Sequence, residues 1–376
     1  MANILYLNNT GSIIGGAENQ LLCLIENLDK SLYNPIVICP DSGEFSARLE
    51  RSGIPVCICH LPASRKAISY PFRRLAAMRL AKIADKHHID LVHASAPWLN
   101  YYAWRVGQLL RIPTISHDRN ALNPERVRKY LFHRFDRTIA ISERMKRDLV
   151  SGGIPPEKIE VIYDGVDLSQ FSPTVSEMDV LRRDHHLREH LVGLVGRIEP
   201  FKRQKEFVRA VSEVLKDRRD VSFLIIGDPA RKASGYFREV QQMIEEYGVS
   251  DNVVFTGYRR DMPEVLNSLD ILVTLSGGSI MMEAMACAKP VIMASKADPA
   301  SLRIVQDGKT GFVVPYDDID SVSKAILRLL EDPEMRYSMG KAGRERAEEL
   351  FDMRKITKLT EAVYADLLVK KSQEVG

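Results

Sequence analysis

The chain has 376 residues, of which 45% are hydrophobic and 27% charged, the composition of an ordinary soluble globular protein long enough for two domains. No hydrophobic run approaches the roughly 20 residues that a membrane-spanning helix needs. The first residues lack a charged region followed by an apolar core, so we expect no secretory signal and a cytoplasmic location.

Short apolar strands alternate with amphipathic helices along the first half of the chain. The predicted strands are residues 4–7, 35–39, 56–59, 91–94, 114–117, 137–141 and 159–162. The predicted helices are residues 17–28, 45–52, 72–86, 101–110 and 143–151. This alternation predicts a parallel sheet with helices on both faces.

A polar stretch at residues 167–176 interrupts the alternation and is typical of an interdomain linker. The alternation then resumes, with predicted strands at 191–195, 221–226, 253–256, 271–275, 291–294 and 312–314. The predicted helices are residues 205–215, 236–247, 262–268, 319–330, 335–350 and 353–369. The chain is therefore predicted to be an α/β protein of two doubly wound domains, residues 1–170 and 171–353, with ligands bound at the carboxyl ends of the strands.

Positive charge is concentrated in the first half, although the formal net charge is only +3. One segment carries seven cations with only Asp85 among them: Arg65, Lys66, Arg73, Arg74, Arg79, Lys82 and Lys86. This predicts an anionic partner, such as a phospholipid surface, a lipid-linked phosphate or nucleic acid. Phe72, Leu75, Met78, Leu80 and Ile83 lie among these cations. The pattern is compatible with peripheral contact at the inner face of a membrane, and equally with a helix packed on its sheet.

No metal site is predicted. The five cysteines have no zinc-ligand spacing, so we expect reduced, mostly buried thiols. The pairs His87-His88 and His185-His186 lack a convincing metal partner.

The segment from Ile271 to Ile292 is the most informative part of the chain. An apolar strand leads into a turn at Gly277-Gly278, a short helix carries Glu283, and Pro290 opens a second strand. A glycine turn before a helix presents backbone N–H groups that suit a phosphate. A carboxylate one turn further on can accept hydrogen bonds from ribose hydroxyls. The segment therefore predicts half of a nucleotide-diphosphate site.

Several short motifs extend this prediction to nearly the whole chain. In order they are Gly15-Gly16-Ala17-Glu18, Ile139–Ser142, Ile162–Asp167, Gly196-Arg197 with Lys202, Glu283–Ala286, Lys289–Ile292 and Asp307–Phe312. In this order they resemble the retaining glycosyltransferases of family 4. The resemblance implies the GT-B fold, in which two Rossmann-like domains face a central cleft and the second domain binds the donor. It also implies that the last helix, about residues 354–376, packs back on the first domain.

The resemblance implies roles for individual residues. Arg197 and Lys202 would neutralise the donor diphosphate and stabilise the charge that grows on the leaving group. Glu283 would bind the donor ribose, and His117 would contact the transferred sugar or the acceptor. The remaining donor-binding residues would be Gly15, Gly16, Gly227, Tyr258, Gly278, Ser279 and Ile280.

Residue types alone leave alternatives open for this set. Arg197 and Lys202 also fit a solvated basic loop, Gly15-Gly16 a simple turn and His117 an ordinary loop histidine. Asp118 is placed to orient the His117 ring, and His93 is a weaker candidate of the same kind.

The implied reaction needs no cofactor and no metal. A UDP- or GDP-sugar leaves with its own diphosphate, so no protein nucleophile is required, and no compelling nucleophile–base pair stands in the sequence. The acceptor would be a glycan, a lipid-linked molecule or a small molecule, in cell-surface polysaccharide or glycoconjugate synthesis.

Two positions depart from the family pattern. Leu275 stands where a first glutamate is usual, seven intervening residues before Glu283, and Asp164 stands where asparagine is common. Leucine cannot accept hydrogen bonds from sugar hydroxyls. A non-catalytic GT-B protein that acts as a binding partner or regulator is therefore the alternative. No signature of a nucleic-acid-binding protein is present, and a sugar-nucleotide epimerase fits the later motifs less well than a transferase.

Overall fold

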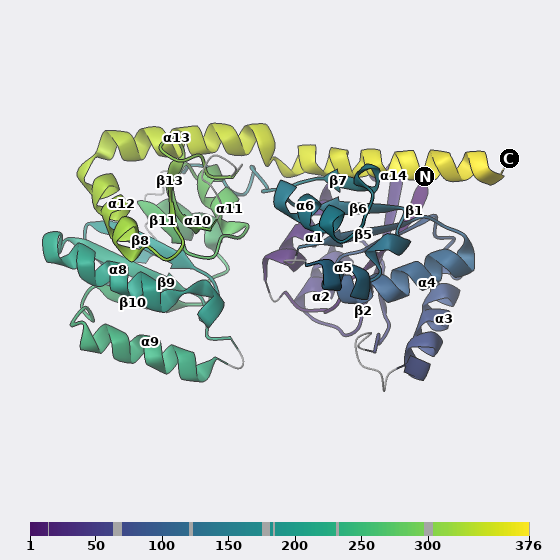
Figure 1. The fold of residues 1–376 in the computed structure, drawn as a ribbon, viewed down its shortest axis with the longest axis horizontal. Coiled ribbons are helices and arrows are strands. Elements are labelled where there is room, and N and C mark those ends of the chain that lie inside the picture. The colour runs from purple at the N-terminus through teal and green to yellow at the C-terminus, as the bar shows by residue number, and fades with distance from the viewer. Residues whose placement is uncertain are drawn as a thin grey trace. The chain divides into compact units, whose positions relative to one another are not determined.

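The computed structural model describes residues 1–13, 15–62, 70–119, 123–174, 181–182, 185–230, 233–296 and 304–375. The chain divides into two compact units. Unit 1 consists of Met1–Gly165 together with Met353–Gly376, and unit 2 of Val166–Asp352. Each unit contains one parallel β-sheet with its own helices (Figure 1).

Unit 1 has a seven-stranded sheet in the order β3-β2-β1-β4-β5-β6-β7. Its strands are β1 Ala2–Leu7, β2 Tyr33–Cys39, β3 Val56–Ile58, β4 Leu91–Ala94, β5 Thr114–Asp118, β6 Arg137–Ala140 and β7 Ile159–Val161. Its helices are α1 Gly16–Asn27, α2 Glu44–Arg51, α3 Tyr70–Lys86, α4 Asn100–Leu110, α5 Pro124–Lys129, α6 Glu143–Ser151 and α14 Met353–Val375.

Unit 2 has a six-stranded sheet in the order β10-β9-β8-β11-β12-β13. Its strands are β8 His190–Val195, β9 Val221–Ile226, β10 Val253–Gly257, β11 Ile271–Thr274, β12 Val291–Ser295 and β13 Gly311–Pro315. Its helices are α8 Gln204–Asp217, α9 Ser234–Glu246, α10 Met262–Ser268, α11 Ile280–Ala286, α12 Ile319–Glu331 and α13 Pro333–Leu350. Strand order reverses between β8 and β11 here, and between β1 and β4 in unit 1, so the predicted doubly wound α/β fold is confirmed.

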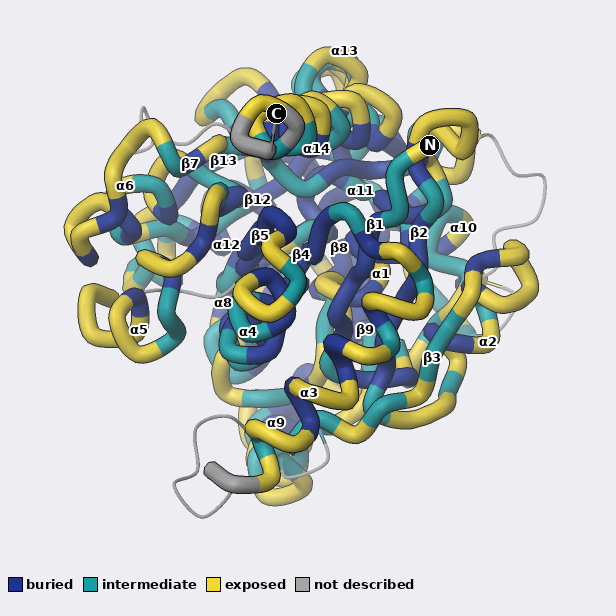
Figure 2. The backbone as a smooth tube through the Cα atoms, turned by 90° about the vertical axis from the view of Figure 1, so that its right-hand side faces the viewer, coloured by how far each residue is buried: buried dark blue, intermediate teal, exposed yellow. Residues whose placement is uncertain are grey.

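The sheets are apolar on both faces because helices cover them, and Figure 2 shows their strands mostly as buried backbone. In unit 1, α1 and α14 pack on one face through side chains such as Leu21, Ile25 and Tyr364. Helices α3 and α4 pack in a second cluster with Leu80 and Tyr102. The last helix of the chain thus shares a core with its first strand.

Helix α5 is a regular helix that the apolar pattern of the sequence does not predict. The Asn123 side chain accepts a hydrogen bond from the Arg126 backbone N–H at 2.8 Å, and Pro124 occupies the first helical position. Asparagine followed by proline is a recognised helix-start signal. The signal was present, but a basic helix of six residues shows too little apolar periodicity to reveal it.

Helix α3 presents two different faces. Ala76, Ala77, Leu80, Ala81 and Ala84 are buried against the sheet and α4, so Leu80 follows the second of the two alternatives, a helix packed on its sheet. Phe72, Leu75 and Met78 are 64%, 48% and 54% exposed, and Arg74, Arg79 and Lys82 are exposed beside them. Arg65 and Lys66 lie outside the described residues. Within those residues no helix combines the length and hydrophobicity needed to cross a bilayer.

Candidate functional site

In unit 2 the loop after β8 forms one side of the candidate site. Gly196 follows the strand with a φ of +146°, a conformation that side-chain-bearing residues rarely adopt. Arg197 comes next, and its guanidinium lies 3.0 Å from the Glu199 carboxylate while its side chain stays 53% exposed. The arginine is therefore held at the strand end and remains open to solvent on one side.

Lys202 connects this loop to the glycine turn after β11. Its stem crosses Gly196 so closely that a Cβ on that glycine would lie 3.0 Å from Lys202 Cε. Its Nζ ends beside Gly278, 3.8 Å from the place of a Cβ there. Burial lowers the pKa of Lys202, Glu199 raises it, and the positive charge of Arg197 lowers it further. Lys202 and the predicted phosphate turn thus meet at the point where strand order reverses, and the positive charge of Arg197 acts on Lys202 from the same loop.

Gly227 and Tyr258 stand at the ends of the next two strands. Gly227 has a φ of +136°, and a Cβ on it would lie 2.4 Å from the Gly196 carbonyl oxygen, so glycine is required by packing alone. The Tyr258 backbone N–H donates to the Asp228 carboxylate at 3.1 Å, and the residue is 56% exposed. The fold therefore explains Gly227 fully and leaves the Tyr258 ring available.

The turn after β11 supplies the other side of the site. Gly277 and Gly278 have φ values of +70° and +118°, and the Thr274 hydroxyl donates to the Gly277 carbonyl at 3.2 Å. Ser279 and Ile280 then begin α11. Glu283, half-buried on this helix, has its pKa raised to about 7 by desolvation, an effect that a hydrogen bond with Ser279 opposes. A carboxyl group with a pKa near 7 is only partly ionised at neutral pH, and a ligand that donates hydrogen bonds to it favours its ionised form.

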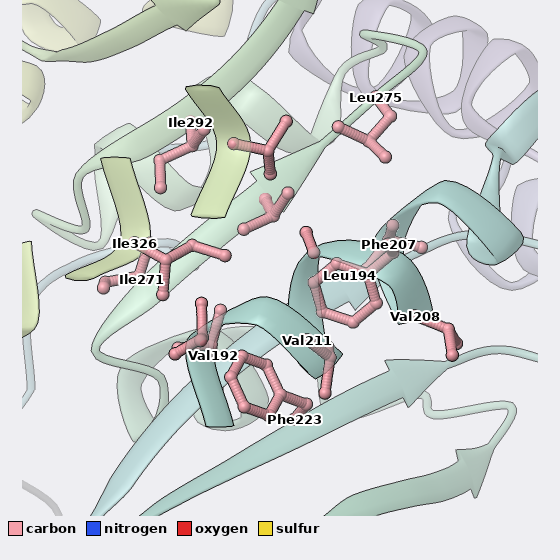
Figure 3. Close-up of a cluster of buried hydrophobic side chains, with 14 of the residues drawn as sticks. Val192, Leu194, Phe207, Val208, Val211, Phe223, Ile271, Leu275, Ile292 and Ile326 are labelled. Carbon is pink, nitrogen blue, oxygen red and sulfur yellow. The ribbon is translucent and has the colours of Figure 1, made fainter. Parts of the chain in front are cut away.

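Leu275, at the position where the family pattern has a carboxylate, is buried in the core and does not line an open site. Its side chain is 1% exposed and belongs to the main hydrophobic core of unit 2, as Figure 3 shows. The chain therefore has no acid at this position, and the apolar side chain contributes to folding.

In unit 1, Gly15 and Gly16 begin helix α1. The Gly15 N–H donates to the Glu18 carboxylate at 2.9 Å, an arrangement that caps the helix. Gly15 has an extended φ of −171°, and a Cβ there would meet only Glu18, at 3.9 Å. Neither conformation nor packing demands glycine at position 15.

His117 belongs to a buried chain of hydrogen bonds. Its Nδ1 lies 3.2 Å from His93 Nε2, and His93 Nδ1 lies 2.7 Å from the Tyr364 hydroxyl. That hydroxyl is 2.8 Å from the hydroxyl of Tyr6. Within the part of the chain that the structure describes, His117 Nε2 is shielded from solvent and has no hydrogen-bond partner, and the ring is oriented by His93. The expected role for Asp118 stays a prediction.

The environment keeps both histidines neutral. Desolvation lowers the pKa of His93 to about 3, with a further contribution from the positive charge of Arg119. The pKa of His117 lies well below its ordinary value for the same two reasons, and His93 adds to the effect. Arg119 itself pairs with Asp164 at 2.7 Å, and both side chains are nearly buried. Aspartate at position 164 thus balances an arginine, and this pair had no clear signal in the sequence.

One group within the described residues has the spacing of a cation site: Glu189, His190 and Asp220. It lies at the amino ends of β8 and β9, opposite to the glycine turns, and Asp220 already binds the Arg218 guanidinium through both oxygens at 2.8 and 2.6 Å. The group is therefore no part of the candidate site.

The fold places the protein in the GT-B class, and solved structures agree. HepE from Anabaena, solved in complex with UDP, superposes with a TM-score of 0.85 over 97% of this chain and 100% of its own, at 24% identity. Sucrose-phosphate synthase from Thermosynechococcus elongatus gives a TM-score of 0.81 over 98% and 100% of the two chains, at 19% identity.

Family models and curated relatives identify the family. The model described as Glycosyltransferase Family 4 matches residues 14–170, and the model described as Glycosyl transferases group 1 matches residues 180–346. The chain belongs to these family 4 glycosyltransferases and is an enzyme. It is 23% identical to an Escherichia coli UDP-Gal:α-D-GlcNAc-diphosphoundecaprenol α-1,3-galactosyltransferase over 96% of both chains. It is 24% identical to N-acetyl-α-D-glucosaminyl L-malate synthase of Bacillus anthracis over 79% of this chain and 80% of the relative.

Proposed function

We propose that the protein is a retaining, metal-independent glycosyltransferase that moves a sugar from a nucleoside-diphosphate sugar to a glycan, lipid-linked or small-molecule acceptor. The observation that carries this proposal is the meeting of Lys202 with Gly278 at the strand-order reversal of unit 2. A lysine ammonium beside a glycine turn supplies a cation and backbone donors to the same diphosphate.

The positive charge of Lys202 contributes to catalysis when the bond between the sugar and the diphosphate breaks. The leaving diphosphate gains negative charge in the transition state, and a partly buried cation stabilises that state more than the ground state. Arg197 gives a second, more exposed positive charge. In this proposal the two side chains replace a divalent metal, and the departing phosphate accepts the proton of the incoming hydroxyl on the same face.

Recognition of the rest of the donor is divided between polar backbone and Glu283. The carboxylate of Glu283 accepts hydrogen bonds from the ribose hydroxyls, and Tyr258 offers an exposed ring near the strand end at which a base would bind. Because Leu275 is in the core, the donor sugar is recognised through the backbone of Gly277, Gly278 and Ser279 and the Ser276 hydroxyl.

For the acceptor, we propose that the protein is cytoplasmic and that helix α3 makes peripheral contact with the inner face of an anionic membrane. Phe72, Leu75 and Met78 recur every three residues and are exposed, and exposed cations flank them. An exposed apolar stripe between cations is the arrangement that inserts shallowly among anionic headgroups. This supports a lipid-linked acceptor more than a freely diffusing one.

The test is a screen of UDP-, GDP- and ADP-sugars by thermal shift in the presence of EDTA, followed by transfer assays with the donor that binds. A ligand at 100 times its Kd stabilises the native state by about 2.7 kcal/mol. We expect one nucleotide class to raise the Tm without metal, and NMR of the product to show the donor's anomeric configuration. Binding that requires Mg²⁺, or an inverted product, would contradict the proposal.

A further inference from the structure

Four aromatic side chains form a continuous polar chain through the core of unit 1. Tyr6 and His93 are register partners on β1 and β4, with ring centroids 5.1 Å apart. Tyr364 reaches them from α14, and His117 follows on β5. Tyr6 and His93 are 0% exposed, Tyr364 is 0% and His117 is 4%. A buried network of this kind is stable only if its donors and acceptors match.

Counting protons gives the direction of the chain. Each of the two phenols and the two neutral imidazoles carries one side-chain proton, and three hydrogen bonds use three of them. The fourth proton remains on a phenol or on His117 Nε2; the phenol is Tyr6, or Tyr364 if that hydroxyl accepts from both of its neighbours. If the proton remained on either phenol, that O–H would have no acceptor in the contacts of the described residues, and the shielded Nε2 of His117 would be an unpaired acceptor as well.

The other direction leaves a single unpaired donor. Tyr6 then donates to Tyr364, Tyr364 to His93 Nδ1, and His93 Nε2–H to His117 Nδ1. His117 must then carry its proton on Nε2. A shielded N–H without a partner is costly, so such a group calls for an acceptor brought by a ligand. The nearby Arg119 opposes a second proton on either ring, and its own Nη1 is also buried with no partner among the residues that the structure describes.

We propose that Tyr364 and His93 are positioning residues that fix His117 as a neutral Nε2–H hydrogen-bond donor to an oxygen of the bound sugar or acceptor. His117 is then neither a general base nor a general acid, since its Nδ1 accepts and its Nε2 keeps its proton. The inference rests on the proposed function for the identity of the ligand. It also makes the docking of the C-terminal helix part of the active site.

The direct readout is the tautomer of His117 in the resting full-length protein. Long-range ¹H–¹⁵N spectra of histidine-labelled protein distinguish protonated from unprotonated ring nitrogens, and His117→Asn assigns the signals. We expect a protonated Nε2 and an unprotonated Nδ1, and a shift of the Nε2 signal when donor and acceptor saturate the enzyme. A protonated Nδ1, or an Nε2 signal whose chemical shift is unchanged by donor and acceptor, would overturn the proposal.

Variants separate positioning from packing. Tyr364→Phe removes the hydroxyl and keeps the ring; we expect mixed His117 tautomers and a kcat about tenfold lower with little change in donor KM. The matched control is Tyr33→Phe. The Tyr33 hydroxyl donates to the Glu361 carbonyl, on the same helix as Tyr364, at 3.1 Å and lies outside the hydrogen-bond chain that ends at His117. His93→Gln, which keeps an N–H donor near Nε2, should retain one tautomer, whereas His93→Leu should not.

Equal losses of kcat in Tyr364→Phe and Tyr33→Phe, with an unchanged tautomer, would show that the hydroxyl acts only through stability. If the wild-type protein transferred no sugar at all, the proposed function would fail. The tautomer measurement would still show whether Tyr364 and His93 fix the tautomer of His117, so the two failures are distinguishable.

Discussion

The strand ends of the two units carry different kinds of side chain, charged in unit 2 and neutral in unit 1. In unit 2 the loop after β8 carries Arg197, Glu199 and Lys202, all charged and partly open to solvent. In unit 1 the end of β5 carries His117, which is buried and held neutral by desolvation, with smaller contributions from Arg119 and His93. The comparison teaches that the same topology places exposed and partly buried charges at one strand end and a buried, uncharged imidazole at the other. Under the proposed function, the first would bind a diphosphate and the second would donate a hydrogen bond.

The largest expected effect belongs to the charged strand end. Lys202→Ala removes the partly buried cation beside Gly278, and we expect kcat to fall by about 100- to 1000-fold, roughly 3–4 kcal/mol of transition-state stabilisation. Steady-state turnover of the identified donor measures this. Lys205→Ala is the control, because Lys205 pairs with Glu239 and lies over the Tyr236 ring. A loss of similar size in both variants would show that no particular cation matters.

Glu283 should make both stability and donor affinity depend on pH. Its pKa of about 7 lies above the ordinary 4.5, so its protonated form contributes stability fully below pH 4.5, and this is lost as pH rises through 7. Compared with Glu283→Gln, the wild type should lose at most about 1.4 kcal/mol per pH unit across that interval. Denaturant unfolding at pH 4.5 to 8 measures the difference.

Donor binding should show the opposite trend. Ribose hydroxyls donate to the ionised carboxylate, so the affinity for a nucleotide sugar should fall by up to tenfold per pH unit below 7. Calorimetric titration of wild type and Glu283→Gln separates this effect from titration elsewhere. Parallel pH profiles for the two proteins would remove Glu283 from the donor site.

Two glycines at the predicted sites should differ sharply when replaced by alanine. Gly227→Ala places a Cβ 2.4 Å from the Gly196 carbonyl at a φ of +136°, and we expect about 2 kcal/mol lost from the free energy of unfolding. Gly15→Ala has space and an extended backbone, so its stability should change by less than about 0.5 kcal/mol. Urea unfolding measures both. If Gly15→Ala nevertheless loses activity, a ligand must approach the Gly15 backbone.

The smallest expected effect on stability lies on helix α3. Phe72→Ser and Met78→Ser replace exposed side chains, so the free energy of unfolding should change by less than about 0.5 kcal/mol. Cosedimentation with anionic vesicles at low salt should fall clearly in the double variant. Tyr337→Ser on α13 of unit 2, 75% exposed, is the matched control and should bind vesicles like the wild type. No binding by the wild type would end the membrane proposal.

Much of the fold could be predicted because apolar periodicity is a local property. Strands such as 91–94 and 221–226 match the structure residue for residue, and each is a short apolar run. The confirmed doubly wound fold follows from their alternation with helices. Helix α5 was missed because its only signal is a cap at Asn123-Pro124.

The candidate site was less predictable because its contacts join distant parts of the chain. The approach of Lys202 to Gly278 follows from topology once the motifs are ordered, but Tyr364 and His93 are 271 residues apart and share no motif. The burial of Leu275 depends on which way one side chain turns at a strand end, and the sequence does not determine this.

The central claim is that Lys202 binds the donor diphosphate, and calorimetry of mono- and diphosphates tests it most directly. The Kd values of the nucleoside diphosphate and monophosphate of the preferred base are measured for wild type and Lys202→Ala, in EDTA. We predict that the substitution weakens diphosphate binding by at least tenfold more than monophosphate binding, because Nζ acts on the terminal phosphate. Equal weakening of both ligands, or no weakening of either, would contradict the account.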